Sequence, residues 1–232
     1  MKKKILIGAG VLLVLIIGFI GYIVVDTLKQ EEKLKNELEE LSVLVNEENI
    51  DVDKVNEMLN RTVTTGDYKV VETSFKEYLS DTFDSIFQMM DILKSDKLGS
   101  ILTIENYQND GPSFVETKAY ILDTKTKLEE LKNSYYTFLT EEKAMSYIEN
   151  KGLDSYYVDL YRDEYVGDME TVNKDKTVEK SINQIIELLN ISEEVINFLS
   201  ENSNSWYIED NVIVFNTDEL SNKYTELINK LQ

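Results

Sequence analysis

An uninterrupted apolar run from Ile5 to Val25 is the strongest pattern in the chain, with no charged residue over twenty-one positions. At a rise of about 1.5 Å per residue, a helix of this length spans roughly 31 Å, close to the hydrocarbon core of a bilayer. Three lysines precede the run and a mixed charged stretch follows it. Because positive charge favours the cytosolic side, the sequence predicts a cytosolic tail at 1–4, a transmembrane helix at 5–25 and an extracytoplasmic C-terminal remainder.

A cleaved signal peptide is the alternative interpretation of this run. The apolar region of a signal peptide is about 7–15 residues long and ends in a small-x-small cleavage site. Here the run is longer, and its exit reads YIVV, with β-branched residues where small ones are needed. We therefore expect an uncleaved signal-anchor in the cell membrane. With four residues before it, we expect the protein to act outside the cell or through a partner in the membrane.

The next pattern is a helical stripe in the charged stretch after the anchor. Leu34, Leu38, Leu41 and Val45 are spaced by four, three and four residues, which places them on one side of a helix. We interpret residues 26–66 as a helical stalk and linker. The stripe predicts self-association as a short coiled coil; the alternative is that it packs back on its own domain.

Residues 67–232 carry apolar residues at helical spacing and few glycines, so they predict an extracytoplasmic domain that is mainly all-α, an antiparallel helical bundle. The principal helices are expected from Asp67 as N-cap to about Ser95, from Pro112 as a first helical position to about Leu139, from Thr177 to Leu199, and onward from a capping box at Asn216.

One β signal interrupts the helical pattern, in the segment WYIEDNVIVF at 206–215. Asp210 and Asn211 tolerate positive φ, which a two-residue hairpin turn requires. In that register Trp206 opposes Phe215 across the hairpin. A lone hairpin is marginally stable, so we expect this face to pack on the helices, with Trp206 buried as an anchor.

The composition excludes several kinds of chemistry. The chain has no Cys and no His, so it has no disulfide, no thiolate or imidazole metal ligand and no Ser-His-Asp triad. Its 24 basic and 44 acidic residues give a net charge of −20, which disfavours nucleic-acid binding. We expect no cofactor, no metal and no catalytic residue. Carboxylate pairs suited to glycoside hydrolysis are inevitable among so many acids and carry little information.

Tyrosines and acids alternate in one segment that is a possible ligand or partner surface. Its members are Tyr156, Tyr157, Tyr161, Tyr165, Asp159 and Asp163. The functional interpretation is a groove for a glycan or peptide, built from ring faces and carboxylates. The structural interpretation is an amphipathic helix whose core positions are tyrosines, since an aromatic stripe at helical spacing usually faces a core. Replacing the tyrosines with leucine separates the two.

Four stretches together carry a resemblance: KKKILIG at the start, LTIENYQNDGPSF at 102–114, MSYIENKGLDSYYVDLYRD at 145–163 and NFLSENSNSWYIEDNVIVF at 197–215. On these, the chain resembles a group of uncharacterised single-pass membrane proteins of low-GC Gram-positive bacteria. The resemblance implies the single-pass topology and no particular chemistry.

Three functions are compatible with these patterns. The first is a membrane-anchored interaction or scaffold protein of the cell envelope, whose partner is another protein or a second copy of itself; its layout is similar to that of divisome-type bitopic proteins. The second is a glycan- or peptide-binding module accessory to a transporter or sensor. The third is a carboxylate-based cell-wall hydrolase.

Overall fold

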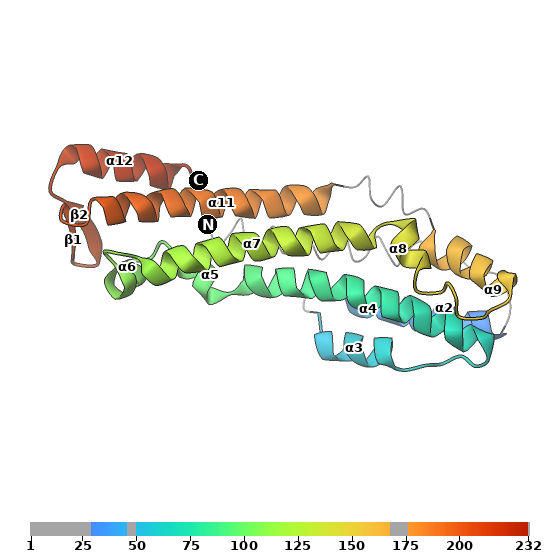
Figure 1. The fold of residues 1–232 in the computed structure, drawn as a ribbon. Coiled ribbons are helices and arrows are strands. Elements are labelled where there is room, and N and C mark those ends of the chain that lie inside the picture. The colour runs from blue at the N-terminus through green and yellow to red at the C-terminus, as the bar shows by residue number, and fades with distance from the viewer. Residues whose placement is uncertain (1–28, 46–49, 168–175, 232) are drawn as a thin grey trace. The chain divides into compact units, whose positions relative to one another are not determined.

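The computed structural model describes residues 29–45, 50–167 and 176–231. These residues are mostly helical, with a small two-stranded antiparallel sheet near the C-terminus. The predicted transmembrane helix at 5–25 and tail at 1–4 lie outside the described residues. In chain order the elements are α2 (Lys29–Val45), α3 (Val52–Asn60), α4 (Asp67–Lys94), α5 (Asp96–Ser100), α6 (Ile104–Asp110), α7 (Val115–Phe138), α8 (Glu141–Met145), α9 (Ser155–Leu160), the π-helical turn η1 (Tyr161–Val166), α11 (Thr177–Glu201), β1 (Trp206–Glu209), β2 (Val212–Phe215) and α12 (Asp218–Asn229) (Figure 1).

The chain divides into two compact units, and α4, α7 and α11 each contribute residues to both. Within the described residues, one unit comprises 89–130 and 179–231, which hold the end of α4, α5, α6, most of α7, most of α11, the hairpin and α12. The other comprises 29–45, 50–88, 131–167 and 176–178, which hold α2, α3, most of α4, the end of α7, α8, α9, η1 and the first two residues of α11. We call them the hairpin unit and the α2 unit.

Helix α11, most of which lies in the hairpin unit, forms where the sequence predicted a helix and buries one side. Its inward positions, including Ser192, are buried: Val178, Ile182, Ile185, Leu189, Ser192, Ile196 and Leu199. The Ser192 hydroxyl donates to the Leu188 carbonyl at 2.8 Å, which satisfies it inside the core. Helix α12 lies beside α11 (Figure 1), and Lys230 Nζ pairs with Glu194 at 2.6 Å between the two helices.

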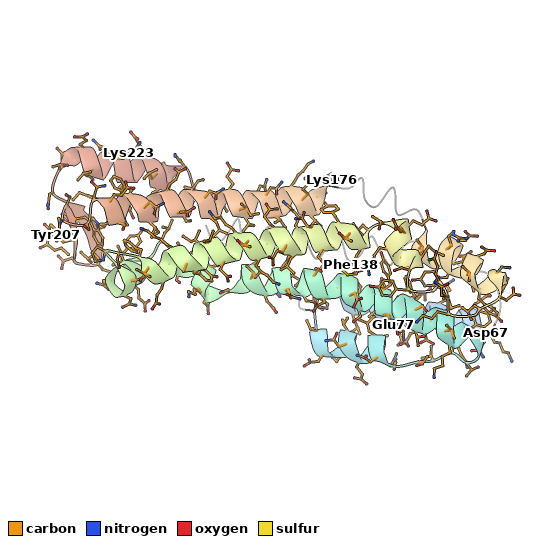
Figure 2. All side chains as sticks on the ribbon, in the orientation of Figure 1. Asp67, Glu77, Phe138, Lys176, Tyr207 and Lys223 are labelled. Atoms are coloured by element: carbon orange, nitrogen blue, oxygen red, sulfur yellow. The ribbon has the colours of Figure 1, made fainter. Side chains whose placement is uncertain are left out.

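The hairpin has the predicted register. Trp206 pairs with Phe215 and Ile208 with Ile213, and the turn residues Asp210 and Asn211 have φ of 49° and 62°. The inward face packs on the helices as expected. Tyr207 lies on the opposite face and is 49% exposed (Figure 2).

The burial predicted for Trp206 is wrong in degree, because the indole is half-buried. It stacks on Phe114 at a centroid distance of 6.2 Å and meets Tyr107 edge-on at 6.4 Å. Its Nε1 donates to the Leu199 carbonyl at 2.8 Å. These contacts from the helices cover part of the indole and leave the rest open, so Trp206 is an anchor at the rim of the core.

Two predicted helix starts are also wrong. Pro112, which follows a cis peptide bond, precedes α7 by three residues. The carboxylate of Asp110 instead accepts hydrogen bonds from the amides of Glu116 and Thr117, at 3.2 and 2.7 Å, and so satisfies donors of the first turn of α7.

The other error concerns α12, whose N-cap is Thr217. Its hydroxyl accepts from the Leu220 amide at 3.4 Å. Asn216 belongs to the hairpin instead. Its backbone N–H donates to the Ser205 carbonyl at 2.9 Å and extends the hairpin pairing by one step.

In the α2 unit, the stripe expected for a stalk is part of the fold. Leu34, Leu38, Leu41 and Val45 are all buried, with exposed fractions of 0–1%. These side chains are covered by their own chain, as the second alternative predicted, so this structure does not offer them to a second copy. The segment predicted as a helical stalk and linker, 26–66, also includes α3, whose N-cap Asp51 accepts from the Lys54 amide at 3.2 Å.

Candidate functional site

The tyrosine-rich segment forms α9 and η1, which follow one another without a break. Gly152 precedes them with φ of 75°, and Asp154 caps α9 by accepting from the Tyr156 amide at 3.0 Å. Positive φ favours glycine, and a carboxylate is a preferred cap, so the local sequence specifies where this helix begins.

Tyr161 is a core residue, which contradicts its place in a ligand groove. Its exposed fraction is 0%, and its hydroxyl donates to the Ala144 carbonyl at 3.0 Å. Its ring meets Phe75 edge-on at 6.1 Å. Burial raises the pKa of Tyr161 above its usual range. For this residue the structural interpretation is correct, because α9 and η1 use it to pack on α4.

Tyr156 and Tyr157 instead form a partly open aromatic patch with Tyr68 of α4. The ring of Tyr157 meets those of Tyr68 and Tyr156 edge-on, each at 5.2 Å. The hydroxyls of Tyr68 and Tyr156 both donate to one carboxylate oxygen of Glu31, at 2.8 and 3.0 Å. Glu31 is 3% exposed, whereas Tyr156 is 50% exposed. We call Tyr68, Tyr156, Tyr157 and Glu31 the tyrosine patch.

Burial, together with the hydrogen bonds to Tyr156 and Glu31, raises the pKa of Tyr68 well above its usual range. The Tyr68 phenol is therefore neutral over a wide pH range. Its chemistry is that of an amphipathic aromatic surface, with one buried carboxylate holding two hydroxyls in place.

The two predicted acids lie on the surface beside this patch. Asp159 is exposed and pairs with Arg162 at 2.8 Å, one turn further along the chain. Asp163 is also exposed. The side chain of Tyr165 lies outside what the structure describes. The structure thus brings Tyr156 and Tyr157 together, separates Tyr161 from them, and leaves Asp159 and Asp163 solvated.

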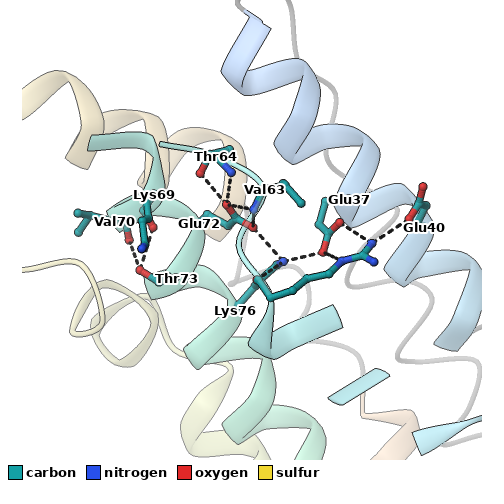
Figure 3. Close-up of polar contacts among 10 residues, drawn as sticks. Glu37, Glu40, Val63, Thr64, Lys69, Val70, Glu72, Thr73 and Lys76 are labelled. Atoms are coloured by element: carbon teal, nitrogen blue, oxygen red, sulfur yellow. Dashed lines mark hydrogen bonds and ion pairs between the residues drawn. The ribbon is translucent and has the colours of Figure 1, made fainter. Parts of the chain in front are cut away.

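The α2 unit contains a buried ion-pair cluster that was not predicted from the sequence (Figure 3). Lys76, which is 2% exposed, pairs with Glu37 of α2 at 2.7 Å and with Glu72 of α4 at 2.9 Å. Arg61 approaches Glu37 from the surface with two nitrogens, Nε at 2.8 Å and one terminal nitrogen at 2.7 Å. We call Glu37, Arg61, Glu72 and Lys76 the buried cluster.

Glu72 is the most enclosed member of the cluster, with an exposed fraction of 0%. It accepts from the Val63 amide at 3.0 Å, from the Thr64 amide at 2.9 Å and from the Thr64 hydroxyl at 2.6 Å (Figure 3). One carboxylate therefore fixes the segment between α3 and α4 against the first turns of α4.

The pKa shifts in the cluster indicate a structural role. Burial by itself raises the pKa of Glu72 and Glu37, but hydrogen bonds outweigh it and the net shift of both is downward. For Glu72 the largest lowering comes from Thr64, and for Glu37 from Arg61, followed in each case by Lys76. A general acid at neutral pH needs the opposite shift. The arrangement keeps both carboxylates ionised and stabilises the fold.

One sequence signal pointed to this cluster. Glu72 and Lys76 are four residues apart on α4, the spacing of a helical ion pair. Surface helices carry many such pairs, and the sequence does not distinguish an exposed pair from one that a second helix covers.

Comparisons with protein-family models, with curated proteins and with solved structures give no match for this chain. In the part of the chain that the structure describes, we find no helix with the length and apolar character needed to cross a bilayer. Within the same residues there is no group of three or more acidic side chains arranged to hold a metal ion.

Proposed function

We propose that this protein is a single-pass, membrane-anchored interaction or scaffold protein of the bacterial cell envelope, with its helical body outside the membrane. The observation that carries the proposal is the uncharged run of twenty-one residues at 5–25, which matches the thickness of a bilayer core. The preceding lysines favour a cytosolic N-terminus. The resemblance to single-pass proteins of low-GC Gram-positive bacteria agrees with this topology.

The folded part supports an interaction role. The described residues form long helices with buried apolar faces, and the perturbed carboxylates Glu37 and Glu72 are engaged in stabilising the fold. The tyrosine patch is partly open, and aromatic rings with polar ends are favoured at interfaces. A glycan- or peptide-binding module is a weaker alternative, because Tyr161 is in the core and does not contribute to a groove.

The lack of native cysteine makes the topology directly testable. Ser221 is exposed on α12, so Ser221→Cys provides a single thiol with little change in structure. We expect the full-length variant to stay in the membrane fraction after carbonate extraction. We also expect a membrane-impermeant maleimide to label it in intact cells stripped of wall.

Labelling only after permeabilisation would place the helical body in the cytosol and overturn the proposal. Release of the chain by carbonate would overturn the anchor itself. Cross-linking from the same thiol, followed by identification of the adducts, tests for the protein partner.

A further inference from the structure

Helix α9 is largely apolar, yet each of its six residues is exposed or half-buried. Its sequence, SYYVDL, has four apolar or aromatic side chains. Tyr156 is half-exposed, and Val158 and Leu160 are only partly covered. Tyr156 thus presents a ring with a polar end at the surface, a kind of side chain favoured where an apolar phase meets water.

Contacts within the α2 unit fix α9 beside the beginning of α2. Tyr156 donates to Glu31, which lies in the first turn of α2, and Tyr157 packs on Tyr68 of α4. Figure 1 shows α9 next to α2 and the first turns of α4, and Figure 2 labels Asp67 at this end of α4.

The chain between the apolar run and the patch is short. Glu31 is six residues beyond Val25, and six residues reach at most about 20–22 Å when fully extended. If the run spans the bilayer, the tyrosine patch therefore lies within this distance of the point where the chain leaves the hydrocarbon core. The interfacial layer on each side of that core is several ångströms thick, so α9 is within reach of it.

We infer that the tyrosine patch and α9 are seated in the lipid–water interface, where they hold the α2 unit against the membrane. The inference rests on the proposed function, since it requires the anchor at 5–25. Tyrosine is favoured in this layer because its ring is apolar and its hydroxyl is polar. The exposed acids Asp154 and Asp159 at either end of α9 keep the helix at headgroup depth, since burying a carboxylate in hydrocarbon is costly.

A spin label tests this seating on the full-length chain reconstituted in phosphatidylcholine vesicles. One nitroxide is attached at Ser155→Cys on α9, and a second, in a separate variant, at Val43→Cys on α2. Val43 is 63% exposed and lies twelve residues beyond Glu31, about 18 Å along the helix. The readout is the collision rate of each label with oxygen, which concentrates in the bilayer, relative to that with a water-soluble nickel chelate.

We expect a several-fold higher oxygen-to-nickel ratio at residue 155 than at residue 43. In the Ser155→Cys background, Tyr156→Ser should lower the ratio, and Tyr156→Phe should preserve it because the ring remains. Far-UV circular dichroism establishes that each variant is folded. A chain that resists carbonate extraction but shows a ratio at 155 as low as at 43 overturns the seating and leaves the anchor in place. An unchanged ratio in folded Tyr156→Ser also overturns the seating, and extraction by carbonate overturns both.

Discussion

Replacing Lys76 with methionine removes a buried ammonium group from α4 and keeps an unbranched side chain in its place. The Nζ atom donates to Glu37 at 2.7 Å and to the Arg61 carbonyl at 3.0 Å, and it pairs with Glu72 at 2.9 Å. Removing one partner of a buried ion pair costs about 3–5 kcal/mol, because a charge is left without compensation in the interior.

The remaining contacts place the expected loss at the lower end of this range. Glu72 keeps three donors from Val63 and Thr64, and Glu37 keeps the paired nitrogens of Arg61. Both carboxylates thus retain hydrogen bonds when Lys76 is gone. We expect Lys76→Met to lower the free energy of unfolding by about 3 kcal/mol.

Urea unfolding of the full-length chain in detergent micelles, followed by far-UV circular dichroism, measures this loss. Hydrogen exchange of peptides covering residues 61–80 locates it, since the amides of Val63 and Thr64 are bonded to Glu72. The matched control is Lys69→Met, an exposed lysine of the same helix, for which we expect a change within about 0.5 kcal/mol. A loss in Lys76→Met no larger than in this control would refute the reasoning, since it would mean that the ammonium group is solvated.

Three further outcomes follow from the same structure. Leu38→Ala should lower the free energy of unfolding by about 2–5 kcal/mol by leaving a cavity under α2, measured by urea titration; an unchanged stability with a lower oligomer mass would instead support the coiled-coil interpretation. Gly66→Ala should lower the free energy of unfolding by about 1–2 kcal/mol, because φ there is +62°, a backbone conformation that a residue with a Cβ rarely adopts. No atom lies close enough to clash with the added Cβ, so the whole loss is conformational, and a stability equal to the parent's would contradict it. The lowered pKa values of Glu37 and Glu72 imply that these carboxylates contribute fully to the free energy of unfolding above the ordinary carboxylate pKa, about 4.3, and that this contribution is lost as the pH falls further. A free energy of unfolding, measured by urea titration, that does not change with pH below this value would contradict the prediction.

Apolar periodicity was sufficient to predict much of the helical body. The apolar stripes of α2 and α11 repeat every three or four residues, and this spacing predicts both helices, because a helix that buries one face must repeat at that interval. The hairpin followed from two residues that tolerate positive φ between apolar strands.

Helix starts were predicted less well, because several polar residues compete to satisfy the same backbone donors. Asp110 caps α7 across a short turn, and Thr217 displaces Asn216 at α12. At α7 the capping carboxylate lies seven positions before the amide it satisfies, and at α12 Asn216 belongs to the hairpin pairing, so the residue type at the expected start does not decide the cap.

The candidate site was predicted only in part for the same reason. Tyr156 and Tyr161 are five residues apart in one segment of similar composition, yet one is half-exposed and the other is fully buried. Which tyrosine faces the core depends on where α4 lies against α9 and η1. The buried cluster depends on a contact between α2 and α4, across thirty-nine positions from Glu37 to Lys76, which no local pattern encodes.

The ammonium group shared by Glu37 and Glu72 also limits how α2 can slide along α4. Apolar stripes repeat every three or four residues, so a shift by one turn, about 5.4 Å, would still place apolar side chains of α2 against apolar side chains of α4. The same shift would separate Glu37 from Lys76 and strand both charges away from water. The ion pair therefore selects a single alignment of the two helices from several that apolar packing alone would accept.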